Sequence, residues 1–238
     1  MTLEDRWLSL KEQIARATER ARRQAEQVRL VAVSKTHEPE KIQQLLNAGQ
    51  IVFGESRVQE ARAKMELVSG RAEWHFIGNL QKNKVKHLMP GFSLLHSLDS
   101  VELGSQLSRI SEEQGWHLPV LLQVNVGRES SKHGFFSDTI GVEAQPLLEM
   151  PRLEVRGLMC LPPFREKPQE ARRDFARVRE LRDELERAWG CALPELSMGM
   201  SHDFEQAIAE GSTFVRVGKA LFGERSGKTW RPLPDEMG

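Results

Sequence analysis

Lys35 could do covalent chemistry, because it ends the apolar run Leu30–Ser34 and directly precedes a helix-starting segment, Glu38–Glu40. A lysine at the end of a buried strand has its stem in packed structure and its amine at the mouth of whatever the strand builds. A primary amine in that position can hold an aldehyde as a Schiff base. Lysines at strand ends are usually solvated, so this interpretation depends on what lies beside Lys35.

Two segments near the other end of the chain have the composition of a phosphate site. Leu196–Ser201 and Phe214–Lys219 are short apolar runs that end near Ser or Gly, residues that let backbone N–H groups approach a phosphate. Gly218 has no Cβ in the way, Ser201 adds a hydroxyl donor, and a helix expected to begin near Asp203 adds the positive end of its dipole.

The elements that would bring these residues together follow a regular rhythm. Eight short apolar or β-branched runs alternate with helical patterns, and strands that are buried on both faces read as continuous apolar runs. This count predicts a single (β/α)8 TIM barrel in preference to an open doubly wound sheet. Closure would set the eighth strand beside the first, and so bring Arg216 and Gly218 next to Lys35. The predicted strands are 30–35, 51–55, 73–78, 93–98, 118–126, 153–161, 195–199 and 214–218.

An additional helix is predicted before the barrel. From Thr2 to about Val28, apolar residues recur at steps of three and four, and Thr2 with Asp5 fits a helix N-terminus. We expect one domain over residues 1–238, with the N-terminal helix at about 3–28, the barrel at about 30–225 and a short C-terminal tail.

The overall composition excludes several classes of function. Lys plus Arg (34) balance Asp plus Glu (34), so no net field recruits nucleic acid or an anionic membrane. The apolar runs fall short of the roughly 20 residues of a membrane helix. Two cysteines and no N-terminal signal segment predict a cytoplasmic protein. His75 and His96 are interpreted as hydrogen-bonded histidines rather than metal ligands, and Cys160 as a buried small residue rather than a nucleophile.

Eight motifs occur in order between about residue 5 and Arg225: Val31–Thr36, Phe53–Glu60, Trp74–Gln81, His96–Ser97, Gln123–Asn125, Arg156–Met159, Leu196–Ser201 and Val215–Gly218. Together they resemble the pyridoxal phosphate homeostasis protein family, whose members are small single barrels related to the N-terminal barrel of alanine racemase. Position 56 is Ser where that family usually has Asn, position 79 is Asn where Pro or His is more usual, and position 219 is Lys where Thr is typical.

The resemblance implies a bound pyridoxal phosphate (PLP) attached to Lys35 as a Schiff base. Its phosphate would be held by Ser201, Gly218 and Lys219, and Arg216 would face the pyridine nitrogen. An arginine stays protonated and donates to an unprotonated ring nitrogen, so the ring becomes a poorer electron sink. The remaining residues that we assign to cofactor binding are Ser56, His75 and Met200.

The function expected from the resemblance is a non-catalytic, reversible carrier and buffer of PLP that serves PLP-dependent apoenzymes, present as a monomer. The alternative is an amino-acid racemase of the alanine racemase type. Two-base racemisation needs a second proton donor, which is a tyrosine in the racemase relatives, and this sequence contains no tyrosine. A third hypothesis is an interaction protein in which the site is vestigial.

Overall fold

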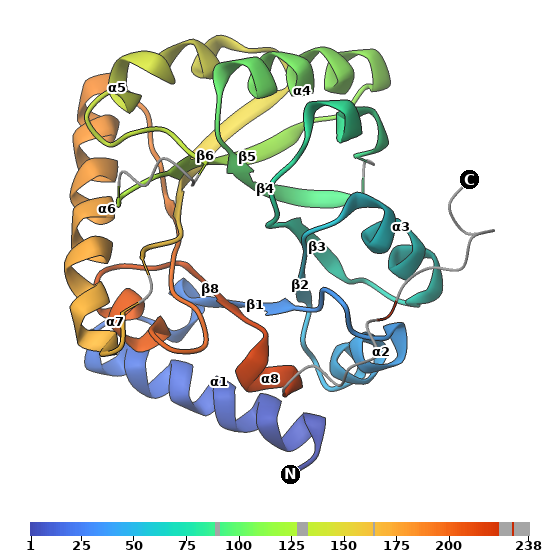
Figure 1. The fold of residues 1–238 in the computed structure, drawn as a ribbon. Coiled ribbons are helices and arrows are strands. Elements are labelled where there is room, and N and C mark those ends of the chain that lie inside the picture. The colour runs from blue at the N-terminus through green and yellow to red at the C-terminus, as the bar shows by residue number, and fades with distance from the viewer. Residues whose placement is uncertain (89–90, 128–132, 164, 224–229, 231–238) are drawn as a thin grey trace.

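Eight parallel strands close into a barrel in sequence order, with β1 hydrogen-bonded to both β2 and β8 (Figure 1). This computed structural model describes residues 1–88, 91–127, 133–163, 165–223 and 230. The predicted (β/α)8 barrel is confirmed. The strands are β1 Arg29–Val33, β2 Val52–Glu55, β3 Glu73–Phe76, β4 Phe92–Leu98, β5 Leu118–Val124, β6 Leu153–Cys160, β7 Glu195–Ser197 and β8 Phe214–Val217.

Helices surround the barrel, but two of the connections depart from the ideal pattern. The chain passes from β3 to β4 through the 3-10 helix η2 Lys82–His87, and from β5 to β6 through the short α5 Ile140–Glu143 and η3 Gln145–Glu149. The other helices are α1 Leu3–Arg20, η1 Ala25–Gln27, α2 Pro39–Asn47, α3 Val58–Leu67, α4 Val101–Gln114, α6 Pro168–Trp189, α7 Phe204–Ala209 and α8 Lys219–Phe222.

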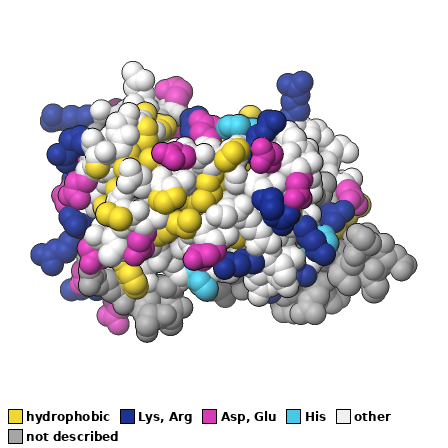
Figure 2. All heavy atoms as spheres, turned by 90° about the horizontal axis from the view of Figure 1, so that it is seen from above, with side chains coloured by type: hydrophobic (Ala, Val, Ile, Leu, Met, Phe, Trp, Pro, Cys, Tyr) yellow, Lys and Arg dark blue, Asp and Glu magenta, His cyan; other side chains and the backbone are white. Residues whose placement is uncertain are grey.

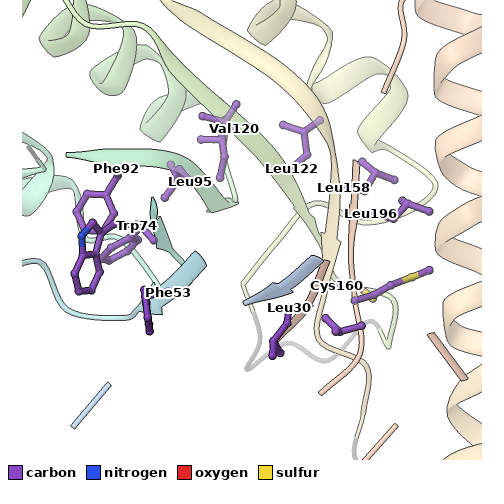
Figure 3. Packing of buried hydrophobic residues seen from close by; sticks show 14 of the residues in the cluster. Leu30, Phe53, Trp74, Phe92, Leu95, Val120, Leu122, Leu158, Cys160 and Leu196 are labelled. Atoms are coloured by element: carbon purple, nitrogen blue, oxygen red, sulfur yellow. The ribbon is translucent and has the colours of Figure 1, made fainter. Parts of the chain in front are cut away.

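The period-two alternation of the strands divides their side chains between two cores. Outward-facing side chains pack under the helices: Leu158 and Leu196, for example, project from β6 and β7 toward α6 (Figure 3). Inward-facing residues form a separate small cluster inside the barrel, made of Val31, Val52, Leu94, Leu121, Met159 and Phe214. The register pairs Val31 with Arg216, so Arg216 also points into the interior.

The predicted N-terminal helix is present, but it ends sooner than expected. Thr2 forms a reciprocal capping box with Asp5, as the sequence indicated. The helix stops at Arg20 rather than near Val28, because the chain turns at Arg22, where φ is +54°. The Arg23 guanidinium then donates to the carbonyls of Ser212 (2.7 Å) and Ile208 (3.2 Å), which fixes this turn against the β8 side of the barrel.

Helix α1 covers the place where the barrel closes. It lies beside α7 and α8 (Figure 1), and Arg6 Nε donates to the Leu221 carbonyl at 2.7 Å. The two ends of the described fold are therefore joined twice, by the β1–β8 pairing and by α1.

The surface shows both signs of charge side by side. Figure 2 presents one face on which basic and acidic side chains are interspersed around a band of apolar ones, in keeping with the zero formal charge. In the part of the chain that the structure describes, every helix is too short or too polar to span a bilayer. The expected C-terminal tail, apart from Trp230, lies outside the described residues.

Candidate functional site

A cavity of about 510 Å³ opens at the C-terminal ends of the strands, where barrel proteins build their sites. Its volume falls in the range of roughly 300–1,000 Å³ that is usual for small-molecule sites. Three of its lining residues are cationic, and none of the lining residues that the structure describes is acidic, so the cavity suits an anion. The lining residues are Val33, Lys35, His37, Ile77, Leu161, Met200, Ser201, Arg216, Gly218, Lys219 and Gly223.

Lys35 lines this cavity from a tight turn that follows β1. The His37 N–H donates to the Ser34 carbonyl at 3.0 Å, and Thr36 has φ +70°. A β-branched residue in the left-handed region is uncommon and needs support from its surroundings. That support comes from Glu60, whose carboxylate accepts a hydrogen bond from the Thr36 N–H.

A buried ionic cluster on the outer side of β1 and β2 holds the residues on both sides of Lys35. Lys64 Nζ, fully buried, donates to the Ser34 carbonyl (2.8 Å), to Glu55 Oε1 (2.8 Å) and to Glu60 Oε1 (2.7 Å). The Ser34 hydroxyl also donates to Glu55, at 2.7 Å. Burial raises the pKa of Glu55 to about 7, against the opposing attraction of Lys64. Sequence analysis missed this cluster, although the i,i+4 spacing of Glu60 and Lys64 was a signal for it.

The expected phosphate-binding residues lie on the same cavity. Ser201, Gly218 and Lys219 line it together with Met200, whose exposed fraction is 38%. A Cβ built on Gly218 would lie 3.3 Å from Val33 Cβ, so glycine here permits close packing of β8 against β1. The Ser201 hydroxyl accepts from the Ala220 N–H at 3.3 Å, which links the loop after β7 to the start of α8.

Arg216 lines the cavity and is almost fully buried. Its Nη2 donates to the Cys160 carbonyl at 2.9 Å, and its Nη1 donates to the Ser197 hydroxyl. Burial lowers the pKa of Arg216, yet a guanidinium starts so high that it stays protonated. The side chain is therefore a fixed cation in the lining of the cavity.

Two of the eight predicted site residues do not line this cavity. His75 is fully buried inside the barrel, where it hydrogen-bonds to Glu73 and His96 and lines a different cavity at the opposite end. The predicted strand, 73–78, already ran past His75; the observed β3 ends at Phe76, and the His75 side chain faces the barrel interior on the same face as Glu73, two residues earlier. Ser56 follows β2, and its backbone is packed so closely against Gly78 that a Cβ at Gly78 would lie 2.4 Å from the Ser56 carbonyl oxygen.

Cys160 and Gly199 have packing surroundings. Burial raises the pKa of Cys160 to about 12, which removes it as a thiolate nucleophile. Gly199 has φ +90°, and a Cβ there would lie 2.6 Å from Ala207 Cβ. Both observations agree with a structural role.

Several residues of the cavity were not predicted. His37 stacks on Phe222 with ring centroids 4.4 Å apart, and both Leu161 and Ile77 add apolar surface. These residues follow strand ends without a polar motif, so only the closed barrel identifies them.

The sequence matches the family described as alanine racemase, N-terminal domain, over residues 9–226. It is 47% identical over 215 residues to a pyridoxal phosphate homeostasis protein of Aquifex aeolicus, covering 90% of this chain and 94% of that protein. It is 42% identical over 212 residues to the mouse protein of the same name, covering 84% and 77%.

Solved structures agree with these matches. PipY of Synechococcus elongatus, solved with PLP bound, superposes with a TM-score of 0.82 at 36% identity, covering 93% of this chain and all of that one. Alanine racemase of Clostridium difficile superposes with a TM-score of 0.67 at 13% identity and 59% coverage of its own chain, which is a likeness of fold alone.

Proposed function

Because this chain belongs to the pyridoxal phosphate homeostasis protein family, with a barrel of the alanine racemase N-terminal type, we propose that it binds PLP reversibly through Lys35. We propose further that it acts as an intracellular carrier and buffer of PLP for apoenzymes that depend on it. The observation that carries this proposal is that Lys35, Ser201 and Gly218 line one cationic cavity.

The residues of the cavity fit the chemistry of this cofactor. PLP supplies an aldehyde that condenses reversibly with primary amines, together with a phosphate and a pyridine ring. Lys35 presents the amine, and the site for the phosphate is made by Ser201, Gly218 and Lys219, with Met200 beside them. Arg216, held by Ser197 and by the Cys160 carbonyl, would donate to the ring nitrogen and so favour its unprotonated form.

Reversible binding without further catalysis is the outcome that we propose for this site. A racemase needs a second acid–base group on the face opposite its lysine. The sequence contains no tyrosine, and the described lining residues include no carboxylate. A ring nitrogen that faces a fixed guanidinium also stabilises a carbanion poorly.

Borohydride reduction followed by peptide mapping tests the anchor. The protein is mixed with PLP, reduced and digested, and we expect a phosphopyridoxyl group on the peptide that contains Lys35. Lys35→Ala should lose this adduct, whereas Lys41→Ala, a change on the partly exposed face of α2, should retain it. An adduct on another lysine in the wild-type protein would refute the assignment.

Exchange of the α-hydrogen of alanine in heavy water tests the absence of catalysis. We expect exchange far below the rate of an ordinary enzyme, which is on the order of 1 per second or more. Exchange at such a rate that is lost in Lys35→Ala would replace the carrier proposal with the racemase alternative.

A further inference from the structure

A continuous chain of hydrogen bonds crosses the interior of the barrel and ends at Arg216. Glu73 Oε1 lies 2.8 Å from His75 Nε2, and His75 Nδ1 lies 2.9 Å from His96 Nε2. His96 Nδ1 lies 2.7 Å from Ser197 Oγ, and Arg216 Nη1 donates to the same hydroxyl. The two imidazoles and the hydroxyl are almost completely buried. Barrel interiors are usually filled by branched apolar side chains, so a polar path through one requires an explanation.

Every donor in this chain of hydrogen bonds points toward the Glu73 end. The guanidinium of Arg216 can only donate, and the Glu73 carboxylate, whose pKa is lowered by its hydrogen bond to His75, can only accept. Burial lowers the pKa of His75, and burial together with the neighbouring His75 lowers that of His96 further, so both rings are neutral at neutral pH. A neutral imidazole has one donor and one acceptor. His75 must therefore donate from Nε2 to Glu73, His96 from Nε2 to His75, and Ser197 from its hydroxyl to His96.

The two ends of the hydrogen-bond chain reach two different cavities. Arg216 lines the 510 Å³ cavity at the C-terminal ends of the strands, whereas Glu73 and His75 line a second cavity of about 190 Å³ at the N-terminal ends. The Glu73 side chain is 31% exposed there, so protons from solvent reach this end. The other charged residues around this N-terminal cavity are Arg29 on β1, Arg156 on β6 and Glu195 on β7.

Charged and aromatic side chains from several strands surround His75 and its partner Glu73. Arg29 lies 3.4 Å from Glu73 and 3.7 Å from Glu195, so the two carboxylates share one guanidinium. The ring of Phe214 meets His75 edge-on, with centroids 5.2 Å apart, and His96 occupies the remaining side. Glu73 is therefore the anion in direct contact with His75 among the described residues.

We propose that this chain of hydrogen bonds couples the protonation of His75 at the N-terminal cavity to the position and hydrogen bonding of Arg216. Glu73, His75, His96 and Ser197 are then positioning residues for the group that meets the ring nitrogen. The identity of that ring rests on the proposed function, whereas the coupling itself is a property of the ligand-free protein.

The coupling follows from counting protons. When His75 takes up one proton, both of its nitrogens donate, so His96 must carry its single proton on Nδ1 instead of Nε2. Ser197 Oγ then accepts from His96 and from Arg216 together, and its own proton loses its acceptor. One proton is gained in total, and the hydrogen bond that fixes Arg216 is weakened.

Nitrogen-15 NMR of the imidazoles in the ligand-free protein tests this inference directly. At pH 8 we expect both His75 and His96 in the Nε2–H form. As His75 titrates, below its ordinary pKa, His96 should change to the Nδ1–H form with the same midpoint while it remains neutral. An Nδ1–H form of either ring at pH 8, an unchanged His96 during the titration, or no titration of His75 before the protein unfolds in acid would overturn the proposal.

Two variants at the N-terminal cavity provide a matched comparison. Glu73→Gln removes the carboxylate that stabilises protonated His75 and should shift the midpoint of the coupled change to lower pH. Glu195→Gln removes a carboxylate from the same cavity, but Glu195 accepts a hydrogen bond from the Thr213 hydroxyl at 2.6 Å and is not part of the hydrogen-bond chain. It should shift the midpoint much less. Equal shifts in the two variants would mean that the cavity acts only through its total charge, which would overturn the role of Glu73.

A second measurement uses the protein loaded with PLP that carries a nitrogen-15 label in the ring. We expect the ring-nitrogen signal to change with the midpoint of His75 in the wild type, and to lose this change in Ser197→Ala. The Glu73→Gln variant should move the midpoints of the His75 signal and of the ring-nitrogen signal together. It keeps the inference testable if Ser197→Ala does not fold. If PLP binds without a change at that midpoint, the coupling is wrong. If PLP does not attach to Lys35 at all, the proposed function is wrong, and the ligand-free tautomers still decide the inference.

Discussion

Replacing Lys64 by methionine should destabilise the fold strongly and in a pH-dependent way. Lys64 is fully buried and donates to three acceptors, and methionine keeps the length of the side chain while it removes the charge. The loss leaves Glu55 and Glu60 buried with no cation in contact among the described residues. Breaking a buried ion pair in this way costs about 3–5 kcal/mol.

The pKa of Glu55 decides where in this range the loss falls. Because this pKa is already about 7, Glu55 can take up a proton near neutrality at small cost in free energy. The loss of stability at pH 7 should therefore lie near the lower limit of this range. Removing Lys64 raises the pKa of Glu55 further. Above about pH 7, Glu55 then stays protonated in the folded variant although it is ionised in the wild type, which adds about 1.4 kcal/mol of destabilisation per pH unit. The destabilisation should therefore be nearly constant from pH 5 to about pH 7 and grow toward pH 8.

Urea unfolding followed by the fluorescence of the five tryptophans at pH 5, 6, 7 and 8 measures this dependence. Lys41→Met, on α2, is the control, because Lys41 is 40% exposed and meets Glu38 only at 3.8 Å, so its loss should be within about 0.5 kcal/mol. Adding Glu55→Gln and Glu60→Gln to Lys64→Met should restore part of the stability. A loss below about 1 kcal/mol at pH 8, or one that does not vary with pH, would refute the account of the cluster.

Three further predictions concern other positions. Glu55→Gln should flatten the dependence of the unfolding free energy on pH. The raised pKa of Glu55 stabilises the wild type below the ordinary carboxyl pKa, and up to about 3 kcal/mol of that stabilisation is lost as pH rises through about 7; urea midpoints across this range measure the loss. Iodoacetamide should alkylate the partly exposed Cys191 in the native protein and leave the buried Cys160 unmodified until urea is added, and labelling of both at equal rates would contradict this. Gly199→Ala should lower the melting temperature much more than Gly190→Ala, because its Cβ would lie 2.6 Å from Ala207 Cβ, whereas a Cβ at Gly190 meets nothing within 4 Å; equal effects would contradict the packing role.

The barrel and its closure could be predicted from sequence because strands buried on both faces leave a continuous apolar signal. Each of the eight predicted strands overlaps an observed one, and closure brings Arg216 to β1 as expected. The end of α1 could not be predicted in the same way, since the charged residues from Arg22 to Gln27 continue an acceptable helical pattern. The contacts of Arg23 with Ile208 and Ser212 decide that boundary, and they depend on residues distant in sequence.

The candidate site was predictable only where its residues carry a local motif. Lys35, Ser201, Gly218 and Lys219 follow strand ends, and the fold alone places strand ends on one face. His75 lies apart from the cavity that Lys35 lines, because its side chain points into the barrel interior and hydrogen-bonds there to Glu73 and His96. The inward direction of His75 follows from the period-two alternation that it shares with Glu73, but its partner on β4 follows only from the observed register.

Two separate polar systems hold the residues around the site, one outside the barrel at β1 and β2 and one inside the barrel. Outside, Lys64 donates to the Ser34 carbonyl and to Glu60, which in turn accepts from the Thr36 N–H; inside, Ser197 accepts from Arg216. Apolar packing alone would resist displacement of these groups only weakly, whereas moving either one would leave buried charges without partners, at several kcal/mol. A backbone around Lys35 and a guanidinium that are held in this way need no ordering when a ligand arrives, so less of the binding free energy is lost to rearrangement. Substitution of Lys64 or Ser197 should therefore alter ligand affinity, although neither residue lines the cavity.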